Sequence, residues 1–280
     1  MNNKVDFKYQ LGVVGLGYVG LPLAVEASLQ GLNVVGYDIN SERVDIINNG
    51  LSPIEDISNE QLSSALKNFH PTTNSKELSE CRNVVISVPT PLTDYQPDLS
   101  YVIDAAKTVG ENLVSNQVVI LESTTYPGTT IEVLIPNLEK RSGLIAGKDF
   151  FVGYSPERID PGNKIWKFKN TPKVISGMND DSTKKIKEFY ESIIDETVVV
   201  NGTKEAEMVK LLENTYRHVN IALINELAML CEMLDIDIWE VVNAAKTKPF
   251  GFESFKPGPG VGGHCIPVDP EYLSFKTRQI

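Results

Sequence analysis

The sequence predicts an α/β fold, with a doubly wound parallel sheet followed by a mostly helical part that contains one long helix. Short apolar runs typical of strands alternate with helical apolar patterns from Leu11 to Val200, which predicts the sheet. The stretch from Lys204 to Leu234 contains neither Gly nor Pro and carries apolar residues at helical spacing. We therefore expect a sheet domain over residues 1–196 and a helical domain over residues 197–280.

Composition and charge narrow the class of protein. The 280 residues are 41% hydrophobic and 22% charged, which is ordinary for a soluble globular protein of one or two domains. A net charge of -11 argues against non-specific binding of nucleic acid, although a local basic cluster can still bind an anionic substrate. No apolar run is long enough to span a bilayer, and the N-terminus lacks a signal-peptide core. Three widely separated cysteines do not suggest a disulfide framework, so we expect a cytosolic protein without a nucleic-acid or membrane partner.

The first strand, Leu11 to Val14, runs directly into a glycine-rich turn of the form GxGxxG. A helical pattern and a second strand, Asn33 to Tyr37, follow, and that strand ends at Asp38. In such a unit the first glycine permits the tight turn, the second lets the backbone approach a pyrophosphate, and the third lets the helix pack closely on the strand. The pyrophosphate then faces the helix N-terminus, where free N–H groups favour an anion. The unit predicts a Rossmann-type NAD-binding domain that binds its cofactor through Gly15, Gly17, Tyr18, Val19 and Gly20.

Asp38 stands where a carboxylate can accept hydrogen bonds from both ribose hydroxyls of adenosine. The same carboxylate would repel a 2'-phosphate, so we expect NAD rather than NADP. Arg43 lies close enough in sequence to contact the phosphate side of the adenosine, but it could equally be a solvated helix residue.

Further buried-type strands are expected at residues 83–88, 116–121 and 150–154. Because ligands of parallel α/β sheets bind beyond the carboxyl ends of the strands, Thr90 and Thr124 are placed at the cofactor cleft. Each hydroxyl could instead serve a turn or a helix cap. For Thr129 and Thr130 we favour that structural role.

A polar loop, Ser155 to Asn163, follows the strand at 150–154. Its Glu157, Arg158 and Asp160 could bind a polar substrate or orient a water molecule. They could equally form an ion pair within the loop, in which Arg158 pairs with Glu157 or Asp160, and we slightly favour this interpretation from the loop alone.

The long helix carries apolar residues at helical spacing, which predicts packing along much of its length and places Cys231 in a core. Its length also suits a dimer interface. Lys210 and Asn214 are four residues apart and therefore share one helix face, with Arg217 and His218 extending a polar flank. Such a pair is common on exposed helices and does not by itself indicate a site.

A glycine- and proline-rich stretch, Gly258 to Pro270, contains Cys265 and, four residues later, Asp269. Glycines let a ligand approach the backbone, and a lone thiol there can act as a nucleophile. A hinge with an incidental cysteine explains the same residues equally well. His70, His218 and His264 are isolated in sequence, so no metal site is expected.

The order of these motifs closely resembles the UDP-glucose/GDP-mannose dehydrogenase family. The motifs that carry the resemblance are GxGxxG with Asp38, Ser123-Thr124, Ser155 to Gly162, Lys210 with Asn214, and the loop around Cys265. The resemblance runs from Leu11 to the end of the chain. The sequence Ser-Pro-Glu-Arg-Ile-Asp-Pro-Gly at 155–162 looks like the branch acting on UDP-N-acetylglucosamine or UDP-N-acetylmannosamine.

The resemblance implies a four-electron oxidation of the sugar C6 alcohol to a carboxylate with two NAD, in surface polysaccharide synthesis. Cys265 would add to the C6 aldehyde, giving a thiohemiacetal and then a thioester that water hydrolyses. Lys210 and Asn214 would stabilise the oxyanion, and Thr124, Glu157 and Asp269 would position or deprotonate water and the substrate hydroxyl. The implied substrate-binding residues are Glu157, Arg158, Lys210, Asn214, Arg217 and Gly262.

The resemblance also implies a further C-terminal UDP-binding domain, which the 280 residues do not include. The length of the long helix leads us to expect a homodimer through it. We therefore expect this chain alone not to complete the reaction. The alternatives are a UDP-glucose 6-dehydrogenase, a catalytically inactive NAD-binding module, and a two-electron alcohol dehydrogenase in which Cys265 has no role.

Overall fold

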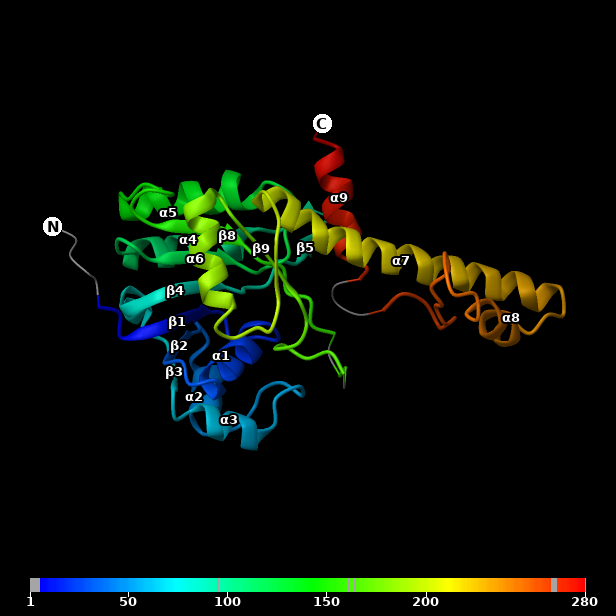
Figure 1. The fold of residues 1–280 in the computed structure, drawn as a ribbon, viewed down its shortest axis with the longest axis horizontal. Coiled ribbons are helices and arrows are strands. Elements are labelled where there is room, and N and C mark those ends of the chain that lie inside the picture. The colour runs from blue at the N-terminus through cyan, green and yellow to red at the C-terminus, as the bar shows by residue number, and fades with distance from the viewer. Residues whose placement is uncertain (1–5, 95, 161, 164, 263–265, 280) are drawn as a thin grey trace. The chain divides into compact units, whose positions relative to one another are not determined.

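The computed structural model describes residues 6–94, 96–160, 162, 163, 165–262 and 266–279 (Figure 1). The chain forms two compact units, and the division between them falls inside the longest helix. The first unit combines the residues up to Pro91 with Asp98–Lys210, and the second combines Leu92–Pro97 with the residues from Leu211 onward.

The first unit is built on an eight-stranded sheet with the order β10-β9-β8-β7-β4-β1-β2-β3. Its strands are β1 (Tyr9–Val14), β2 (Val34–Tyr37), β3 (Phe69–Thr72), β4 (Cys81–Ile86), β7 (Val118–Leu121), β8 (Phe151–Tyr154), β9 (Lys173–Gly177) and β10 (Thr197–Val199). Across the sheet, the neighbouring strands β8, β7, β4, β1, β2 and β3 all pair in parallel. The predicted α/β class, with its glycine turn between β1 and the first helix, is therefore confirmed.

One pair departs from the parallel pattern. β8 and β9 run antiparallel, with Gly153 opposite Gly177, and β10 then pairs parallel to β9. A loop rather than a crossover helix joins β8 to β9, and parallel neighbours require such a crossover. The glycine matters here because a Cβ at Gly153 would lie 2.0 Å from the carbonyl oxygen of Ser176.

Helices cover both faces of this sheet. They are α1 (Gly20–Leu29), α2 (Ser41–Asn48), α3 (Asn59–Ala65), α4 (Ser100–Asn112), α5 (Ile135–Ser142) and α6 (Asp180–Tyr190), with the short helices η1 (Ser75–Glu80) and η2 (Thr130–Leu134). Alternate strand residues enter two separate cores, as period-two geometry requires. Val118 and Ile120 pack with α1, α3 and α6, whereas Val119 and Leu121 pack with α4 and α5.

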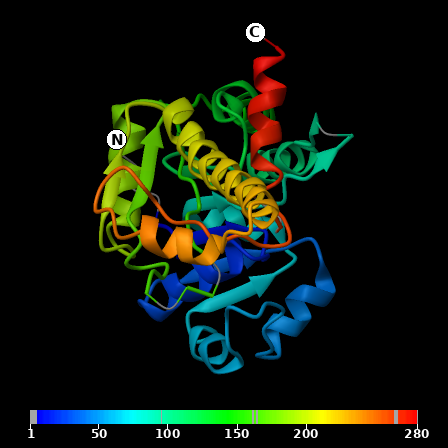
Figure 2. The ribbon, with the colours of Figure 1, turned by 90° about the vertical axis from the view of Figure 1, so that its right-hand side faces the viewer.

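Helix α7 (Thr203–Met233) agrees with the predicted long helix to within one residue at each end. It begins in the first unit and continues in the second, which also holds the β5–β6 hairpin (Leu92–Thr93 and Gln96–Pro97), α8 (Ile238–Ala245) and α9 (Asp269–Thr277). In Figure 2, α8 lies beside the C-terminal half of α7. No described helix is long and apolar enough to cross a membrane.

The predicted packing of α7 along much of its length is wrong for the single chain. Leu211 is fully buried, but Leu212, Val219 and Leu223 are each more than half exposed. Cys231, which was expected in a core, is only partly buried. Helical periodicity identifies the apolar face of a helix, but it does not identify what covers that face.

Candidate active site

The glycine-rich turn after β1 has the geometry that its sequence predicts. Gly15 adopts a φ of +93°, a left-handed conformation that favours glycine. Its N–H donates to the carbonyl of Tyr37 at 2.9 Å, and its own carbonyl accepts from the Ser87 hydroxyl at 3.1 Å. A Cβ at Gly20 would lie 1.9 Å from that Gly15 carbonyl oxygen, so α1 can pack against the turn only with glycine there.

Gly17 differs from its neighbours, because a Cβ built on it meets no described atom closer than 3.9 Å. The fold would therefore accommodate a side chain at Gly17, but the sequence has none there, so this face of the turn is bare backbone. Helix α1 begins at Gly20, and its N-cap residue Val19 supplies no side-chain hydrogen bond to the first turn. A helix N-terminus without a side-chain cap, beside open backbone, suits a pyrophosphate. Tyr18 is 70% exposed at the same turn.

Asp38 is nearly fully buried at the end of β2. Its Oδ2 accepts from the Leu16 N–H at 2.8 Å, and its Oδ1 accepts from the Asn40 N–H at 2.9 Å. Arg43 on α2 donates to Oδ2 at 3.3 Å. We expected Arg43 either to contact the adenosine phosphate side or to be solvated, and neither expectation included this ion pair with Asp38. The pair places the Arg43 guanidinium beside the glycine turn.

Thr90 and Thr124 lie on neighbouring loops at the carboxyl edge of the sheet, after β4 and β7 respectively, and both are partly buried. The Ser123 hydroxyl ties the two loops together by donating to the Val88 carbonyl at 2.8 Å. Thr129 has the turn role that we favoured, whereas Thr130 serves neither a turn nor a helix cap but a contact with a distant helix. The Thr129 hydroxyl donates to the Tyr126 carbonyl, and the Thr130 hydroxyl donates to Glu207.

Glu157 follows β8 and is held by a partner that sequence reasoning missed. Its Oε2 accepts from Lys173 Nζ at 2.8 Å, and its Oε1 accepts from the Arg158 and Ile159 N–H groups. The charged partner found for this carboxylate is therefore Lys173 rather than the Arg158 guanidinium of the ion pair that we favoured. Arg158 is partly buried and donates through its guanidinium to the Pro172 carbonyl at 2.7 Å.

Lys173 also contacts a second carboxyl. Its Nζ lies 2.7 Å from Glu122 Oε1, which accepts from the Tyr190 hydroxyl at 2.5 Å as well. Burial raises the pKa of Glu122 despite the nearby lysine. Burial would also raise the pKa of Glu157, but Lys173 and the backbone N–H donors outweigh it, and the pKa is lowered. The surroundings therefore shift the pKa values of Glu122 and Glu157 in opposite directions.

Lys210 on α7 contacts the same loop. Its Nζ donates to the backbone carbonyl of Glu157 at 2.6 Å. The structure therefore brings together two residues, Lys210 and Glu157, that the sequence placed in one site from motifs 53 residues apart.

In the second unit, α7 anchors the segment that follows Cys265. Asn214 Nδ2 donates to Asp269 Oδ2 at 2.5 Å, and His218 Nδ1 lies 3.2 Å from the Ile266 carbonyl. Asp269 is nearly fully buried at the start of α9. Arg217 and Gly262 are exposed. Cys265 itself, the predicted nucleophile, lies outside the described residues, as does His264.

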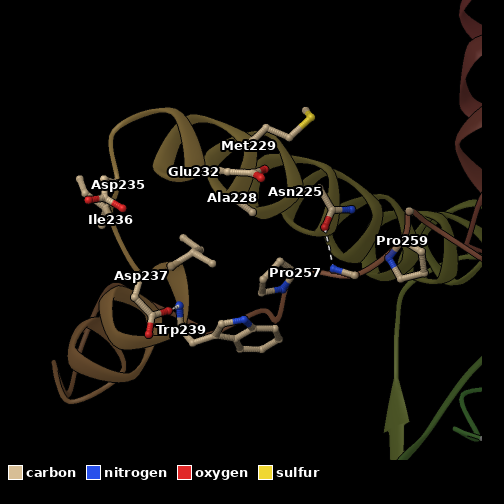
Figure 3. Close-up of a pocket in the computed structure, with 13 residues that line it drawn as sticks. Asn225, Ala228, Met229, Glu232, Asp235, Ile236, Asp237, Trp239, Pro257 and Pro259 are labelled. Atoms are coloured by element: carbon tan, nitrogen blue, oxygen red, sulfur yellow. Dashed lines mark hydrogen bonds between the residues drawn. The ribbon is translucent and has the colours of Figure 1, made fainter.

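A separate open pocket of about 910 Å³ lies between the C-terminal part of α7, α8 and the segment Pro257–Gly260 (Figure 3). The Gly258 N–H donates to Asn225 at 2.9 Å across its mouth. The described residues that line it include Glu232, Asp235 and Asp237 but neither lysine nor arginine. That charge opposes a nucleotide phosphate, and no predicted site residue is among these described lining residues.

Three residues of the site region were given no role from the sequence: Lys173, Glu122 and Glu207. Lys173 offered one signal, a charged residue opening an otherwise apolar strand. Glu207 is fully buried on the second turn of α7 and accepts from Gly128 N–H, Thr130 N–H and the Thr130 hydroxyl at 2.6–2.8 Å. It thereby ties the root of α7 to the loop that carries Thr124.

Comparison with protein families agrees with this arrangement. The NAD binding domain of the UDP-glucose/GDP-mannose dehydrogenase family matches residues 9–194, and the central domain of the same family matches residues 204–280. The chain belongs to this family. The resemblance inferred from the motifs is confirmed, and with it the NAD-binding character of the first unit.

Individual relatives are similar over nearly the whole chain. UDP-N-acetyl-D-glucosamine 6-dehydrogenase of Salmonella typhi is 43% identical over 273 residues, covering 97% of this chain and 63% of the relative. Protein CapL of Staphylococcus aureus is 44% identical over 272 residues, covering 96% and 63%. A solved structure of UDP-D-ManNAc dehydrogenase from Pyrococcus horikoshii superposes with a TM-score of 0.89 at 39% identity, covering 94% of this chain and 64% of that one. The chain thus spans about 63% of the length of these curated relatives.

Proposed function

We propose that this chain provides the cofactor and central domains of an NAD-dependent dehydrogenase that oxidises the C6 hydroxyl of a UDP-N-acetylhexosamine to the uronate. The observation that carries the proposal is the contact of Lys210 with the Glu157 loop, within a chain whose relatives are named for UDP-N-acetylhexosamines. We assign the chain to surface polysaccharide synthesis in the cytoplasm. We divide it into a sheet domain and a helical domain, and place the boundary after β10 (Thr197–Val199) rather than at the expected residues 196 and 197, because that strand belongs to the sheet.

The residues around the glycine turn fit NAD. Open backbone at Gly17, the start of α1 without a side-chain cap and the buried Asp38 carboxylate match a pyrophosphate and an adenosine ribose. Tyr18, Val19, Arg43, Thr90 and Thr124 are assigned to the same cofactor site. When bound, NAD supplies the acceptor for the electrons removed from the sugar.

The chain's own residues have the following proposed roles. Cys265 adds to the C6 aldehyde, because an aldehyde becomes oxidisable at that carbon only after a nucleophile has added, and oxidation of the adduct gives a thioester. Lys210 and Asn214 stabilise the oxyanion. Thr124, Glu157 and Asp269 position or deprotonate the hydroxyl and the hydrolytic water. Arg158, Arg217 and Gly262 bind the substrate.

Two NADH are expected for each sugar consumed. The assay uses protein extended through the C-terminal sequence of its relatives, beside the 280-residue chain, with UDP-N-acetylglucosamine, UDP-N-acetylmannosamine and UDP-glucose. Cys265→Ala is expected to lower kcat by about 1,000-fold or more, since covalent catalysis is lost. One NADH per sugar would indicate a two-electron dehydrogenase. Binding of NAD without oxidation of any of the three UDP-sugars would favour a catalytically inactive NAD-binding module. Oxidation of UDP-glucose alone would indicate a UDP-glucose 6-dehydrogenase.

Asp38→Asn is expected to reduce the preference for NAD over NADP by about 10- to 100-fold, because a neutral amide no longer repels a 2'-phosphate and makes weaker hydrogen bonds to the ribose. Arg43, now without its carboxylate partner, would be available to the phosphate. The measurement is the ratio of the two dissociation constants. Thermal unfolding of the variant controls for loss of the contacts to Leu16 and Asn40, and an unchanged ratio would contradict the role of Asp38.

We also propose a homodimer through α7. Exposed apolar side chains recur along this helix at three-, four- and seven-residue spacing: Leu212, Tyr216, Val219, Leu223 and Leu230. Leu223→Asp is expected to convert a dimer into a monomer in sedimentation experiments while NAD affinity is retained. The matched control, Glu226→Asp, changes a polar residue on the same helix and is expected to remain dimeric. A monomeric wild type would refute the proposal.

A further inference from the structure

Three ionisable side chains and one phenol meet beneath the loop that carries Glu157. Lys173 opens β9 and lies between Glu122, which follows β7, and Glu157, which follows β8. Tyr190, from α6, donates to Glu122 from the other side. The side chains of Lys173 and Glu122 are 4% and 0% exposed, and that of Glu157 is 14% exposed.

The cluster holds two carboxyls and one ammonium group, so full ionisation would leave a net negative charge in a buried place. An unpaired buried charge is costly, and a single bound proton removes it. Lys210 also faces this cluster, but its ammonium group bonds to the backbone carbonyl of Glu157 rather than to a carboxylate. The charged or titratable groups identified around the two carboxyls are thus Lys173, Lys210 and Tyr190.

The hydrogen bonds indicate which carboxyl holds the proton. Both oxygens of Glu157 accept from donors, Oε1 from two backbone N–H groups and Oε2 from Lys173. Glu122 accepts only at Oε1, and its buried Oε2 has no hydrogen-bond partner among the described residues. Donors stabilise an anion, so Glu157 is the better carboxylate and Glu122 the better acid. The opposite directions of their pKa shifts agree with this geometry.

We propose that Lys173 and Glu122 are positioning residues of the active site: Lys173 holds Glu157 as a carboxylate anion, and Glu122, which shares that lysine, stays protonated. This inference rests on the proposed role of Glu157 as a base or water-positioning group. Lys173 then fixes both the ionisation and the rotamer of the Glu157 side chain. The backbone carbonyl of Glu157 accepts a hydrogen bond from Lys210. The neutral Glu122 accepts from Lys173 without competing for its charge.

The first test is the pH dependence of kcat/KM for the extended enzyme with its UDP-sugar. Lys173→Met is expected to move the acid limb upward by about 1–3 pH units, because Glu157 loses its opposite charge. Lys173→Arg is expected to restore most of the wild-type profile. Glu122→Gln is expected to leave the acid limb in place, since glutamine resembles a protonated carboxyl. Lys187→Met removes an exposed lysine of α6 and serves as the matched control.

The second test needs no turnover and remains available if Lys173→Met fails to fold. Infrared spectra in H₂O and D₂O at neutral pH are expected to contain the carbonyl band of a buried protonated carboxyl, which Glu122→Gln removes. Absence of that band in the wild type, or a shift of the acid limb in Glu122→Gln as large as in Lys173→Met, would overturn the proposal. Failure of the wild type to oxidise any UDP-sugar would instead refute the proposed function, whatever the infrared result.

Discussion

Gly20→Ala is expected to destabilise the first unit strongly, whereas Gly17→Ala is expected to keep the fold and weaken NAD binding. At Gly20 the added carbon would lie 1.9 Å from the Gly15 carbonyl oxygen and 2.4 Å from the Ser87 hydroxyl oxygen. Both atoms belong to the hydrogen-bonded turn, so α1 itself would have to move. We expect a loss of about 3 kcal/mol or more in the free energy of unfolding, the upper end of the usual cost of overpacking.

At Gly17 the added methyl group meets no described atom closer than 3.9 Å, and the residue does not adopt a positive φ. The melting temperature is therefore expected to stay close to that of the wild type. The methyl group would, however, occupy the face that a pyrophosphate approaches. NAD affinity measured by calorimetry is expected to fall by about 100-fold, which is about 2.7 kcal/mol. Wild-type affinity in Gly17→Ala would refute the placement of the pyrophosphate at this turn.

Glu207→Ala is expected to lower the free energy of unfolding by about 3 kcal/mol. The substitution leaves two buried N–H groups and the Thr130 hydroxyl without their shared acceptor, and each unsatisfied group costs about 1–3 kcal/mol before relaxation. Glu205→Ala is the matched control, because that carboxylate lies on the same part of α7 but is exposed. Its expected cost, measured by chemical denaturation, is below about 0.5 kcal/mol. Equal losses in the two variants would contradict the anchoring role.

The pH dependence of this site has a definite sign. Burial raises the pKa of Glu207 above its ordinary value, even though the Thr130 and Gly128 donors oppose the shift. The stability contributed by such a group is full below the pKa of the unfolded chain and is lost as pH rises through the folded pKa. The stability advantage of the wild type over Glu207→Gln is therefore expected to shrink as the pH rises from the acid range to neutrality. An advantage that grows with pH would contradict this assignment.

The sequence by itself determined the features that depend on neighbouring residues. The glycine turn, the strand leading into it and the length of α7 follow from local patterns of apolar, glycine and helix-forming residues. The family followed from the order of several such motifs. Lys210 and Asn214 were placed on one helix face by their four-residue spacing, and each contacts a residue that the motifs had also singled out.

Only the tertiary structure decided which side chains pair across distant segments. The charged partner of Glu157 is Lys173 rather than a side chain of its own loop, because the antiparallel β8–β9 pair brings the start of β9 beside the loop after β8. Glu207 reaches Thr130 across 77 residues of sequence. Periodicity identifies the apolar face of α7, but only the structure shows that this face is exposed. Charge pairing and burial depend on distances between residues in space, and these distances are fixed by the order in which the strands pair in the sheet.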